Sequence, residues 1–467
     1  MDLSDLQHAN NYRDRVASVT EDGARSWVYA LQPKGVYYNA RSILSIVYLV
    51  LFFGIPFVKI NGMPFILLNV VEGKFILFSK IFWPQDFFIF AIAMITFIVF
   101  IALFTVIYGR LFCGWICPQT IFMEMIFRRI EWWIEGSPAK QRQLNQAAWS
   151  FTKISKKTIK HFVFFTISFL IANTFLSYIF GLDELMKIIS EPILNHKALF
   201  VGLIGFTILF YIVFAFVREI VCTTICPYGR LQGVLFDKDT LLVAYDYVRG
   251  EPRSKFNKKA ERTSGDCIDC NQCVNVCPTN IDIRNGTQLD CTNCTACIDA
   301  CDFMMEKVGQ PKGLIRYASE NGISEGKKLT FTPKIKAYSV VLLVLSAVLV
   351  VLLITRKDIQ TSVARVSGQL YQELPYGKLS NLYTSKIINK TNKEFPVELR
   401  LENIKGDIRF VGKPILNLKK ESINQAEFFI EVDKKDIHQR KTKLIIGLYR
   451  NGEKIESIKT NFLGPFI

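Results

Sequence analysis

The segment "VCTTICPYGR" at residues 221–230 contains two cysteines four positions apart, with a proline directly after the second. It follows an apolar run at 198–217 that contains no charged residue. A second segment of this kind, "FCGWICPQT" at 112–120, follows the apolar run 87–108. An apolar run of about 20 residues is long enough to cross a bilayer as a helix. Both cysteine pairs are therefore expected where a membrane helix reaches the polar surface.

The two segments align with each other at an offset of 109 residues. This offset superimposes the apolar run, both cysteines and the proline, and it matches Cys113 with Cys222 and Cys117 with Cys226. Both copies enter the membrane in the same direction, so we expect a parallel internal repeat about an axis along the membrane normal. If the copies pack together, the four cysteines meet at the cytoplasmic face of one helical bundle.

Half of the 467 residues are hydrophobic, which favours a membrane protein over a chain of soluble domains. We expect an α-helical transmembrane bundle of about five helices. The segments that are apolar enough to span are 41–58, 87–108, 162–182, 198–217 and 337–354.

The net charge of +16 is distributed unevenly along the chain. The connection 109–160 carries nine Lys or Arg residues, whereas 59–86 and 181–197 carry three and two. Short loops rich in Lys and Arg stay in the cytoplasm. This predicts a multi-pass protein of the bacterial inner membrane with its N-terminus and residues 218–336 in the cytoplasm and its C-terminal tail in the periplasm. No nucleic-acid motif accompanies the charge, so we expect a membrane partner and no nucleic acid.

The paired cysteines point to soft-metal chemistry. Residues i and i+4 share one face of a helix, and a proline after the second cysteine interrupts the helix there. Thiolates suit Cu(I), zinc and iron–sulfur clusters. A buried cysteine can also serve as a small hydrophobic residue, but the duplication of both pairs with their prolines argues against that interpretation. A disulfide is disfavoured because the site faces a reducing compartment.

Between the fourth and fifth apolar segments lies "CIDCNQCVNVCP" at 267–278, followed by "CTNCTACIDAC" at 291–301. This spacing is that of a bacterial ferredoxin with two 4Fe–4S clusters, in which the fourth cysteine of each run binds the other cluster. Zinc also uses such pairs, but the doubled order of eight cysteines argues against it. The predicted ligand sets are Cys267, Cys270, Cys273 and Cys301 for one cluster and Cys277, Cys291, Cys294 and Cys297 for the other. Asp302 replaces the second expected proline.

The C-terminal tail has alternating apolar and polar residues and an Asn451–Gly452 turn, which predict short strands and a hairpin. About 100 residues of this kind without cysteine favour an immunoglobulin-like β-sandwich. The sequence therefore predicts five parts: a cytoplasmic N-terminal segment (1–40), a four-helix core (41–240), an α+β ferredoxin domain (241–336), a fifth helix (337–354) and an all-β domain (355–467).

From about residue 30 onward, the order of these features resembles the FixG/RdxA/CcoG family of cytochrome c oxidase accessory proteins. The shared features are the two C-x-x-x-C-P motifs after membrane helices, the doubled ferredoxin run, the last helix and the β-rich tail. Polyferredoxin membrane subunits of nitrate and nitrous-oxide systems share the Cys–Pro motifs, but the tail favours the first group.

The resemblance implies reduction of Cu(II) to Cu(I) for assembly of a C-type (cbb-type) haem–copper oxidase. Copper would be a substrate or transient ligand, and the catalytic and copper-binding residues would be Cys113, Cys117, Cys222 and Cys226. The implied partners are a copper chaperone or copper-exporting pump, oxidase subunits or assembly factors, and a cytosolic electron donor.

Two other functions remain open on the sequence. The first is a membrane redox relay that passes electrons from quinol to a periplasmic reductase without any role for copper. The second is a non-catalytic scaffold for oxidase assembly, in which the clusters are structural and the tail recruits oxidase subunits. The relay predicts cluster reduction that depends on quinone, and the scaffold predicts that cluster ligands matter only for protein yield.

Overall fold

The computed structural model describes residues 25–467 except for a few short segments. Those outside the description are 1–24, 61, 71–72, 84–85, 193–196, 257–263, 327–331, 369, 413–415 and 466–467. The chain forms two compact units. One comprises residues 1–58 and 91–348, and the other comprises 59–90 and 349–467.

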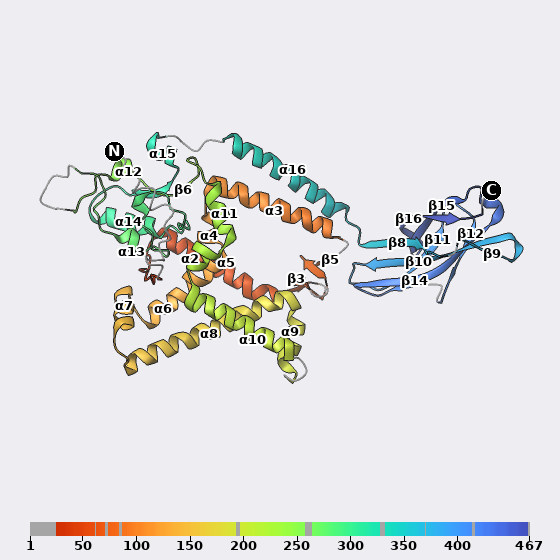
Figure 1. The fold of residues 1–467 in the computed structure, drawn as a ribbon, viewed down its shortest axis with the longest axis horizontal. Coiled ribbons are helices and arrows are strands. Elements are labelled where there is room, and N and C mark those ends of the chain that lie inside the picture. Colours follow the sequence, from red (N-terminus) through yellow and green to blue (C-terminus); the bar gives the residue numbers. More distant parts are fainter. Residues whose placement is uncertain are drawn as a thin grey trace. The chain divides into compact units, whose positions relative to one another are not determined.

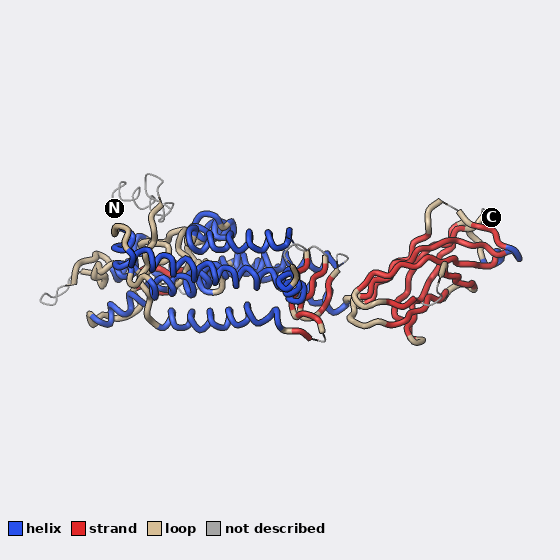
Figure 2. Tube along the Cα trace, turned by 90° about the horizontal axis from the view of Figure 1, so that it is seen from below, coloured by secondary structure: helices blue, strands red, loops and turns tan. Residues whose placement is uncertain are grey.

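Five helices are long and apolar enough to cross a membrane, which confirms the five predicted spans. Figure 1 shows them as long helices, and Figure 2 shows the same helices in blue. They are α2 (Val36–Gly54, continued by the short helix Ile55–Phe57), α3 (Phe87–Tyr108), α8 (Phe151–Phe180), α10 (Lys197–Ile212) and α16 (Pro333–Thr355). The apolar window of α16 is 0% buried within the chain, as expected for a helix that faces lipid on every side.

Helix α8 begins at Phe151, well before the predicted start at 162. Its first turns carry several lysines, so an apolar window misses them. Ser150 caps this end, because its hydroxyl accepts the backbone N–H of Lys153 at 3.2 Å. The side chains of Lys153 and Lys160 are buried rather than solvated. Polar contacts inside the protein thus extend the helix beyond its apolar part.

The bundle core is aromatic. Phe127 and Phe214 stack with ring centroids 4.5 Å apart, and Phe164 meets Phe127 edge-on at 4.8 Å. These rings come from three different segments: the π-helix Ile121–Phe127, the π-helix Val213–Val217 that extends α10, and α8. Such contacts hold the segment after the first cysteine motif and the segment before the second motif against helix α8.

The prolines interrupt the helices as predicted. Pro118 begins α5 (Pro118–Thr120) and Pro227 begins α11 (Pro227–Leu235), both at the first helical position, where proline is favoured. The cysteine before each proline is not helical: Cys117 has φ −56° and ψ 127°, and Cys226 has φ −70° and ψ 112°. The expectation that each pair shares one helical face is therefore wrong, because the second cysteine of each pair lies at the break.

The region with the eight ferredoxin cysteines is small and lies in the first unit. Its strands β6 (Leu242–Tyr245) and β7 (Ile315–Ala318) pair antiparallel. Its helices and turns are α12 (Tyr247–Gly250), α13 (Gln272–Asn275), a 3₁₀ turn (Ile283–Asn285), α14 (Ala296–Lys307) and α15 (Glu320–Ser324).

This region is attached directly to the membrane helices. The Asp299 carboxylate accepts the backbone N–H groups of Tyr37 and Tyr38 at 3.2 and 2.7 Å. These N–H groups lie in the first turn of α2, where a carboxylate is favourable. At the end of α3, the carbonyls of Val106 and Ile107 accept hydrogen bonds from the Thr240 hydroxyl and the Leu241 N–H at 3.0 and 2.9 Å.

The second unit contains a β-sandwich (blue in Figure 1, red strands in Figure 2). One sheet has the order β12-β14-β10-β8 with β9 on β10, and the other has the order β13-β11-β15-β16. The strands of the first sheet are β8 (Ile359–Arg365), β9 (Gln372–Leu374), β10 (Lys378–Asn389), β12 (Gly406–Phe410) and β14 (Ser422–Asp433). Those of the second are β11 (Phe395–Leu401), β13 (Leu416–Leu418), β15 (Lys441–Arg450) and β16 (Glu453–Leu463). The predicted hairpin at Asn451–Gly452 is confirmed, since β15 and β16 pair antiparallel across it.

Residues 59–90 also belong to this unit and contain strands that the sequence did not reveal. These are β1 (Lys59–Ile60), β2 (Met63–Pro64), β3 (Ile66–Asn69), β4 (Lys74–Leu77) and β5 (Lys80–Phe82). Asp86 is buried and forms ion pairs with Lys390 at 2.5 Å and Arg356 at 3.3 Å. These pairs join the segment before α3 to the sandwich.

Candidate metal centres

The two ferredoxin runs have matching backbones. Asp269 and Asn293, the second residues after the first cysteine of each run, have φ of 50° and 54°. Asn271 and Thr295, two positions further on, have φ of 57° and 65° and immediately precede α13 and α14. Left-handed residues are uncommon, so their recurrence marks a specific loop that turns the cysteines inward.

The first predicted ligand set lies together. Burial raises the pKa of the Cys301 thiol above its ordinary value, and the nearby thiols of Cys273, Cys270 and Cys267 raise it further. Cys301, from the second run, is therefore close to three cysteines of the first run. This is the crossed arrangement that the spacing predicts.

The second predicted set surrounds a cavity. The cysteines that line it are Cys277, Cys291, Cys294 and Cys297, with Cys273 of the first set. Burial raises the pKa of Cys297, and the thiols of Cys294, Cys291 and Cys277 raise it further. Ile281 and Ile283 line the same cavity. Four thiol donors in an apolar enclosure fit an iron–sulfur cluster.

Asp302, which stands where the second run would have a proline, allows a longer helix. In the first run α13 ends at Asn275, before Pro278, whereas α14 continues through Asp302 to Lys307. A proline inside α14 would break it. The Asp302 carboxylate instead accepts the backbone N–H of Gly313 at 2.8 Å.

The four membrane cysteines also come together. All four are free thiols of intermediate exposure. Burial raises the pKa of Cys222 to about 12, with Cys117, Cys113 and Cys226 raising it further. Burial likewise raises the pKa of Cys113 to about 12, with contributions from Cys117 and Cys226. The two motifs thus contribute to one group of thiols.

Gln232 orients one of these thiols. The Cys113 thiol donates to the Gln232 Oε1 atom at 3.1 Å, and the Gln232 amide donates to the Thr105 hydroxyl at 3.1 Å. Gln232 is buried in α11, whereas Thr105 is buried in α3. A residue of α11, the helix that begins at the proline of the second motif, therefore fixes a cysteine of the first motif.

The thiol group and the second ferredoxin set are neighbours. Thr279 and Thr292 line the cavity of the second set and also line an adjoining pocket that Cys222 borders. Met123 and Glu124 border this pocket too. The first motif packs on the same loop, because a β-carbon on Gly114 would lie 2.5 Å from the Thr292 carbonyl oxygen.

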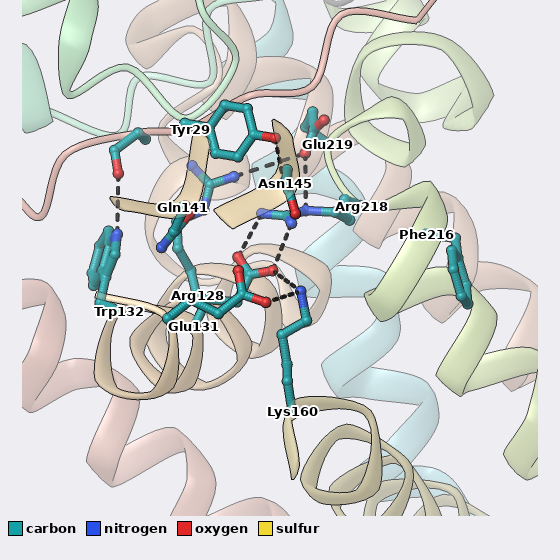
Figure 3. A network of polar contacts seen from close by, with 12 residues as sticks. Tyr29, Arg128, Glu131, Trp132, Gln141, Asn145, Lys160, Phe216, Arg218 and Glu219 are labelled. Carbon is teal, nitrogen blue, oxygen red and sulfur yellow. Dashed lines mark hydrogen bonds and ion pairs between the residues drawn. The ribbon is translucent and has the colours of Figure 1, made fainter. Parts of the chain in front are cut away.

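Behind the cysteine motifs lies a buried network of charges (Figure 3). The Arg218 guanidinium donates to both Glu131 carboxylate oxygens, at 2.8 and 3.0 Å. Lys160 pairs with Glu131 at 3.6 Å and with Glu135 at 2.9 Å. Burial alone would raise the pKa of Glu131, but Arg218, Lys160 and Arg128 hold it below its ordinary value.

Arg128 connects this network to two further carboxylates. It pairs with Glu124, four residues earlier, at 3.3 Å, and it also faces Glu219 at 3.7 Å. Arg218 has φ 55°, an uncommon value for a residue with a side chain. Its double hydrogen bond with Glu131 offsets that strain. The sequence did not reveal this network. The only sign of it in the sequence is that charged residues stand next to the apolar runs.

Within the described ranges, no group of three or more His, Cys, Asp or Glu side chains is arranged to hold a single metal ion. This includes the four membrane thiols, which are neighbours but are not set at the distances of one ion's ligands. A four-iron cluster is larger than an ion and keeps its thiolates further apart. The ferredoxin sets fit such a group by donor type and enclosure.

Three segments match known protein families. Residues 217–320 match a 4Fe-4S dicluster domain, and residues 90–137 match a 4Fe-4S binding domain. Residues 349–465 match a family described as an IG-like fold at the C-terminal of FixG.

The curated proteins to which the chain is similar include RdxA, RdxB and FixG. The chain is 31% identical over 400 residues to protein RdxA of Cereibacter sphaeroides, and the aligned region covers 82% of this chain and 81% of RdxA. It is 33% identical over 339 residues to protein RdxB of the same organism, covering 70% of each. It is 35% identical over 258 residues to the nitrogen fixation protein FixG of Rhizobium meliloti, covering 54% of this chain and 49% of FixG.

Among solved structures, a FixG-related protein from Vibrio parahaemolyticus matches 24% of this chain and 100% of its own chain. That match has 20% identity and a TM-score of 0.21.

These findings define an iron–sulfur electron-transfer protein of the membrane, with a dicluster ferredoxin region and an immunoglobulin-like C-terminal domain. The chain belongs to the FixG/RdxA family.

Proposed function

We propose that this protein is a cupric reductase, which takes electrons from a cytosolic donor and reduces Cu(II) to Cu(I) at Cys113, Cys117, Cys222 and Cys226. The observation that carries the proposal is the gathering of these four thiols beside the second ferredoxin set. When bound, the two 4Fe–4S clusters supply one-electron transfer. The chain's own residues bind copper, orient the thiols and exclude water.

The copper step needs one electron per ion: Cu(II) gains an electron and becomes Cu(I). Cu(I) is soft and prefers thiolate and thioether ligands. Cys222 and Met123 border the pocket next to the second ferredoxin set and offer both kinds of sulfur. Gln232 accepts a hydrogen bond from the Cys113 thiol and so fixes its position in the group of four thiols. Copper is the substrate here, and Cu(I) leaves by exchange to other ligands.

The internal repeat is part of this proposal. The positions related by the 109-residue offset have similar backbones: Gly109 has φ 57° and Arg218 has φ 55°. In each motif the second cysteine donates its N–H to the residue five positions earlier, Cys117 to Phe112 at 3.0 Å and Cys226 to Val221 at 2.7 Å. These likenesses support an origin of the thiol group in two copies of one unit.

We further propose that the ferredoxin region (241–336) is cytoplasmic and the C-terminal domain (355–467) periplasmic, in the bacterial inner membrane. The distribution of Lys and Arg supports this orientation. The family relationship supports a role in assembling a C-type haem–copper oxidase. Copper would then pass to a chaperone or a copper-exporting pump, and the C-terminal domain would contact oxidase subunits or assembly factors.

The experiment starts from anaerobic, prereduced protein. Cu(II) is added while cluster absorbance is recorded and Cu(I) is trapped by a chromogenic chelator. We expect Cu(I) to form in step with cluster oxidation, and Cys222→Ser with Cys226→Ser to abolish it while cluster absorbance persists. Thr224→Ala, an exposed change between the two cysteines, is the matched control and should retain activity.

The same samples distinguish the competing functions. Copper reduction that survives the cysteine changes would contradict the thiol site and would indicate chemistry at the clusters themselves. Cluster reduction by quinol without copper binding would favour the relay.

Iron analysis provides a further test. Binding of two 4Fe–4S clusters predicts about eight irons per chain, and about twelve irons would mean that the membrane thiols hold a third cluster. The match of residues 90–137 to a 4Fe-4S binding domain makes this measurement necessary.

A further inference from the structure

Arg110 is a buried cation between the two groups of cysteines. It is 3% exposed and lies three residues before Cys113. One guanidinium nitrogen donates to the Gly229 carbonyl, whereas its Nε has no hydrogen-bond partner. Among the residues that the structure describes, no carboxylate forms an ion pair with Arg110. Arg218, by contrast, has Glu131.

The guanidinium of Arg110 lies against helix α11. A β-carbon added to Gly229 would lie 3.8 Å from its terminal nitrogen, and one added to Gly233 would lie 4.0 Å away. Gly229 and Gly233 are one helical turn apart in α11. Leu289, two residues before Cys291, also packs at Gly233. The guanidinium therefore lies where α11 meets the second ferredoxin run.

The backbone just before Arg110 is held by the ferredoxin region. The carbonyls of Val106 and Ile107 accept hydrogen bonds from Thr240 and Leu241. Asn293, two residues after Cys291, donates to the Tyr108 carbonyl at 3.4 Å. The backbone that carries Arg110 is thus fixed relative to the cysteine loop, and the Gly229 carbonyl holds its guanidinium.

The charge of Arg110 acts on a thiol in each group. Burial raises the pKa of Cys113 to about 12, and Arg110 opposes that rise. Burial also raises the pKa of Cys291 to about 12, and Arg110 opposes it there too. A buried charge is costly unless it has a partner. The available partners of Arg110 are these sulfur sites, which become negative when they hold metal.

We propose that Arg110 is a positioning residue that serves as the shared counter-charge of the two redox sites. It stabilises an added electron at the site of Cys277, Cys291, Cys294 and Cys297, and it lies three residues before Cys113 of the thiol group. This site would then be the one from which electrons leave the ferredoxin region. The inference deepens the proposed function and rests on its cluster assignment.

The first test needs no copper. The midpoint potentials of both clusters are measured by redox titration with EPR detection in the full-length protein. Net charge near a cluster sets its potential, and removing a positive charge disfavours the reduced state. We expect Arg110→Gln to lower one midpoint potential and leave the other in place. Arg110→Lys keeps the charge and should restore most of the loss.

Arg284→Gln is the matched control. Arg284 is also a mostly buried cation, but its charge acts on Cys273 of the first set. It should lower the other midpoint potential. The proposal is overturned if Arg110→Gln leaves both potentials unchanged, if it shifts both equally, or if it shifts the same one as Arg284→Gln.

A second arm adds Cu(II) to the prereduced variants. We expect Arg110→Gln to slow Cu(I) formation relative to Arg110→Lys. If wild-type protein makes no Cu(I), the proposed function fails while the potential measurement still decides the role of Arg110. The other outcome is that wild-type protein makes Cu(I) and that Arg110→Gln matches it in the rate of Cu(I) formation and in both midpoint potentials. In that case the proposed function stands and only the inference about Arg110 fails.

Discussion

Gly114 of the first cysteine motif packs directly on the backbone of Thr292 in the second ferredoxin run. A β-carbon on Gly114 would lie 2.5 Å from the Thr292 carbonyl oxygen and 2.9 Å from the carbonyl carbon of Asn293. These are backbone atoms, so no side chain can rotate away to make room. The membrane thiols and the second ferredoxin set are close because residue 114 has no side chain.

Gly114→Ala should therefore separate the two sites. Overpacking of this kind costs about 1–3 kcal/mol, so we expect the protein to assemble with a lower melting temperature. Electron transfer from the clusters to copper should slow more than the iron content falls. Gly202→Ala is the control, because a β-carbon at Gly202 of α10 meets nothing within 4 Å. Equal transfer rates in Gly114→Ala and Gly202→Ala would contradict this role of the contact.

The crossed ligand assignment predicts which cysteine changes are redundant. Cys301→Ser should remove about four irons per chain, and adding Cys267→Ser should remove no more, since both belong to one cluster. Combining Cys301→Ser with Cys291→Ser should remove about eight. Iron and acid-labile sulfide analysis of the purified variants measures this. The opposite pattern, in which Cys301 and Cys291 are redundant, would mean that each run keeps its own cluster.

The buried pair Arg218–Glu131 predicts a large and specific loss of stability. Glu131→Gln removes the carboxylate that accepts two hydrogen bonds from the Arg218 guanidinium, and breaking such a buried pair costs about 3–5 kcal/mol. We expect a marked drop in the melting temperature of the detergent-solubilised protein. Replacing both residues, with Arg218→Met and Glu131→Leu, should recover part of that loss. A Glu131→Gln variant as stable as wild type would show that Glu219 and Glu135 suffice to balance Arg218 and Lys160.

The same carboxylate predicts sensitivity to acid. The pKa of Glu131 in the folded protein lies below its ordinary value. Its contribution to stability is therefore present above its unfolded-state pKa of about 4.3 and is lost as the pH falls through the folded-state value. Melting temperatures of wild type should decline on acidification below about pH 4, and the difference between wild type and Glu131→Gln should shrink there. A constant difference would contradict the assignment.

Copper binding should strengthen as the pH rises. Burial raises the pKa of Cys113 and of Cys222 to about 12, so these thiols are protonated at neutral pH. A thiol must lose its proton to bind a metal. Each thiol that binds Cu(I) should therefore increase the affinity about tenfold per pH unit below that pKa. Competition with a chromogenic Cu(I) chelator between about pH 6 and about pH 8 measures the slope, and a flat profile would exclude thiol ligands.

Local patterns of the sequence predicted the features that depend on neighbouring residues. The apolar runs identified the five spans, and the turn at Asn451–Gly452 identified the hairpin. Cysteine spacing grouped Cys301 with the first run, and the structure brings these thiols together. The first two signals lie within a single segment, and the third lies within the doubled cysteine run.

Contacts between distant segments were beyond these patterns. Arg218 and Glu131 are far apart in sequence, and only the folded bundle brings their charges together. The early start of α8 depends on lysines that find carboxylates such as Glu135, which a hydropathy window counts as unfavourable. The expectation of a shared helical face for Cys113 and Cys117 failed because the proline reshapes the residue before it.

The pairing of Asp86 with Lys390 has a practical consequence for anyone who shortens this protein. A truncation after α16 would remove the β-sandwich and, with it, Lys390 and Arg356, the cations that face the buried Asp86 carboxylate. The strands at 59–82 would lose their packing partners at the same time. Loss of activity in such a shortened protein would therefore not assign a function to the sandwich, because the segment leading into α3 would be damaged as well.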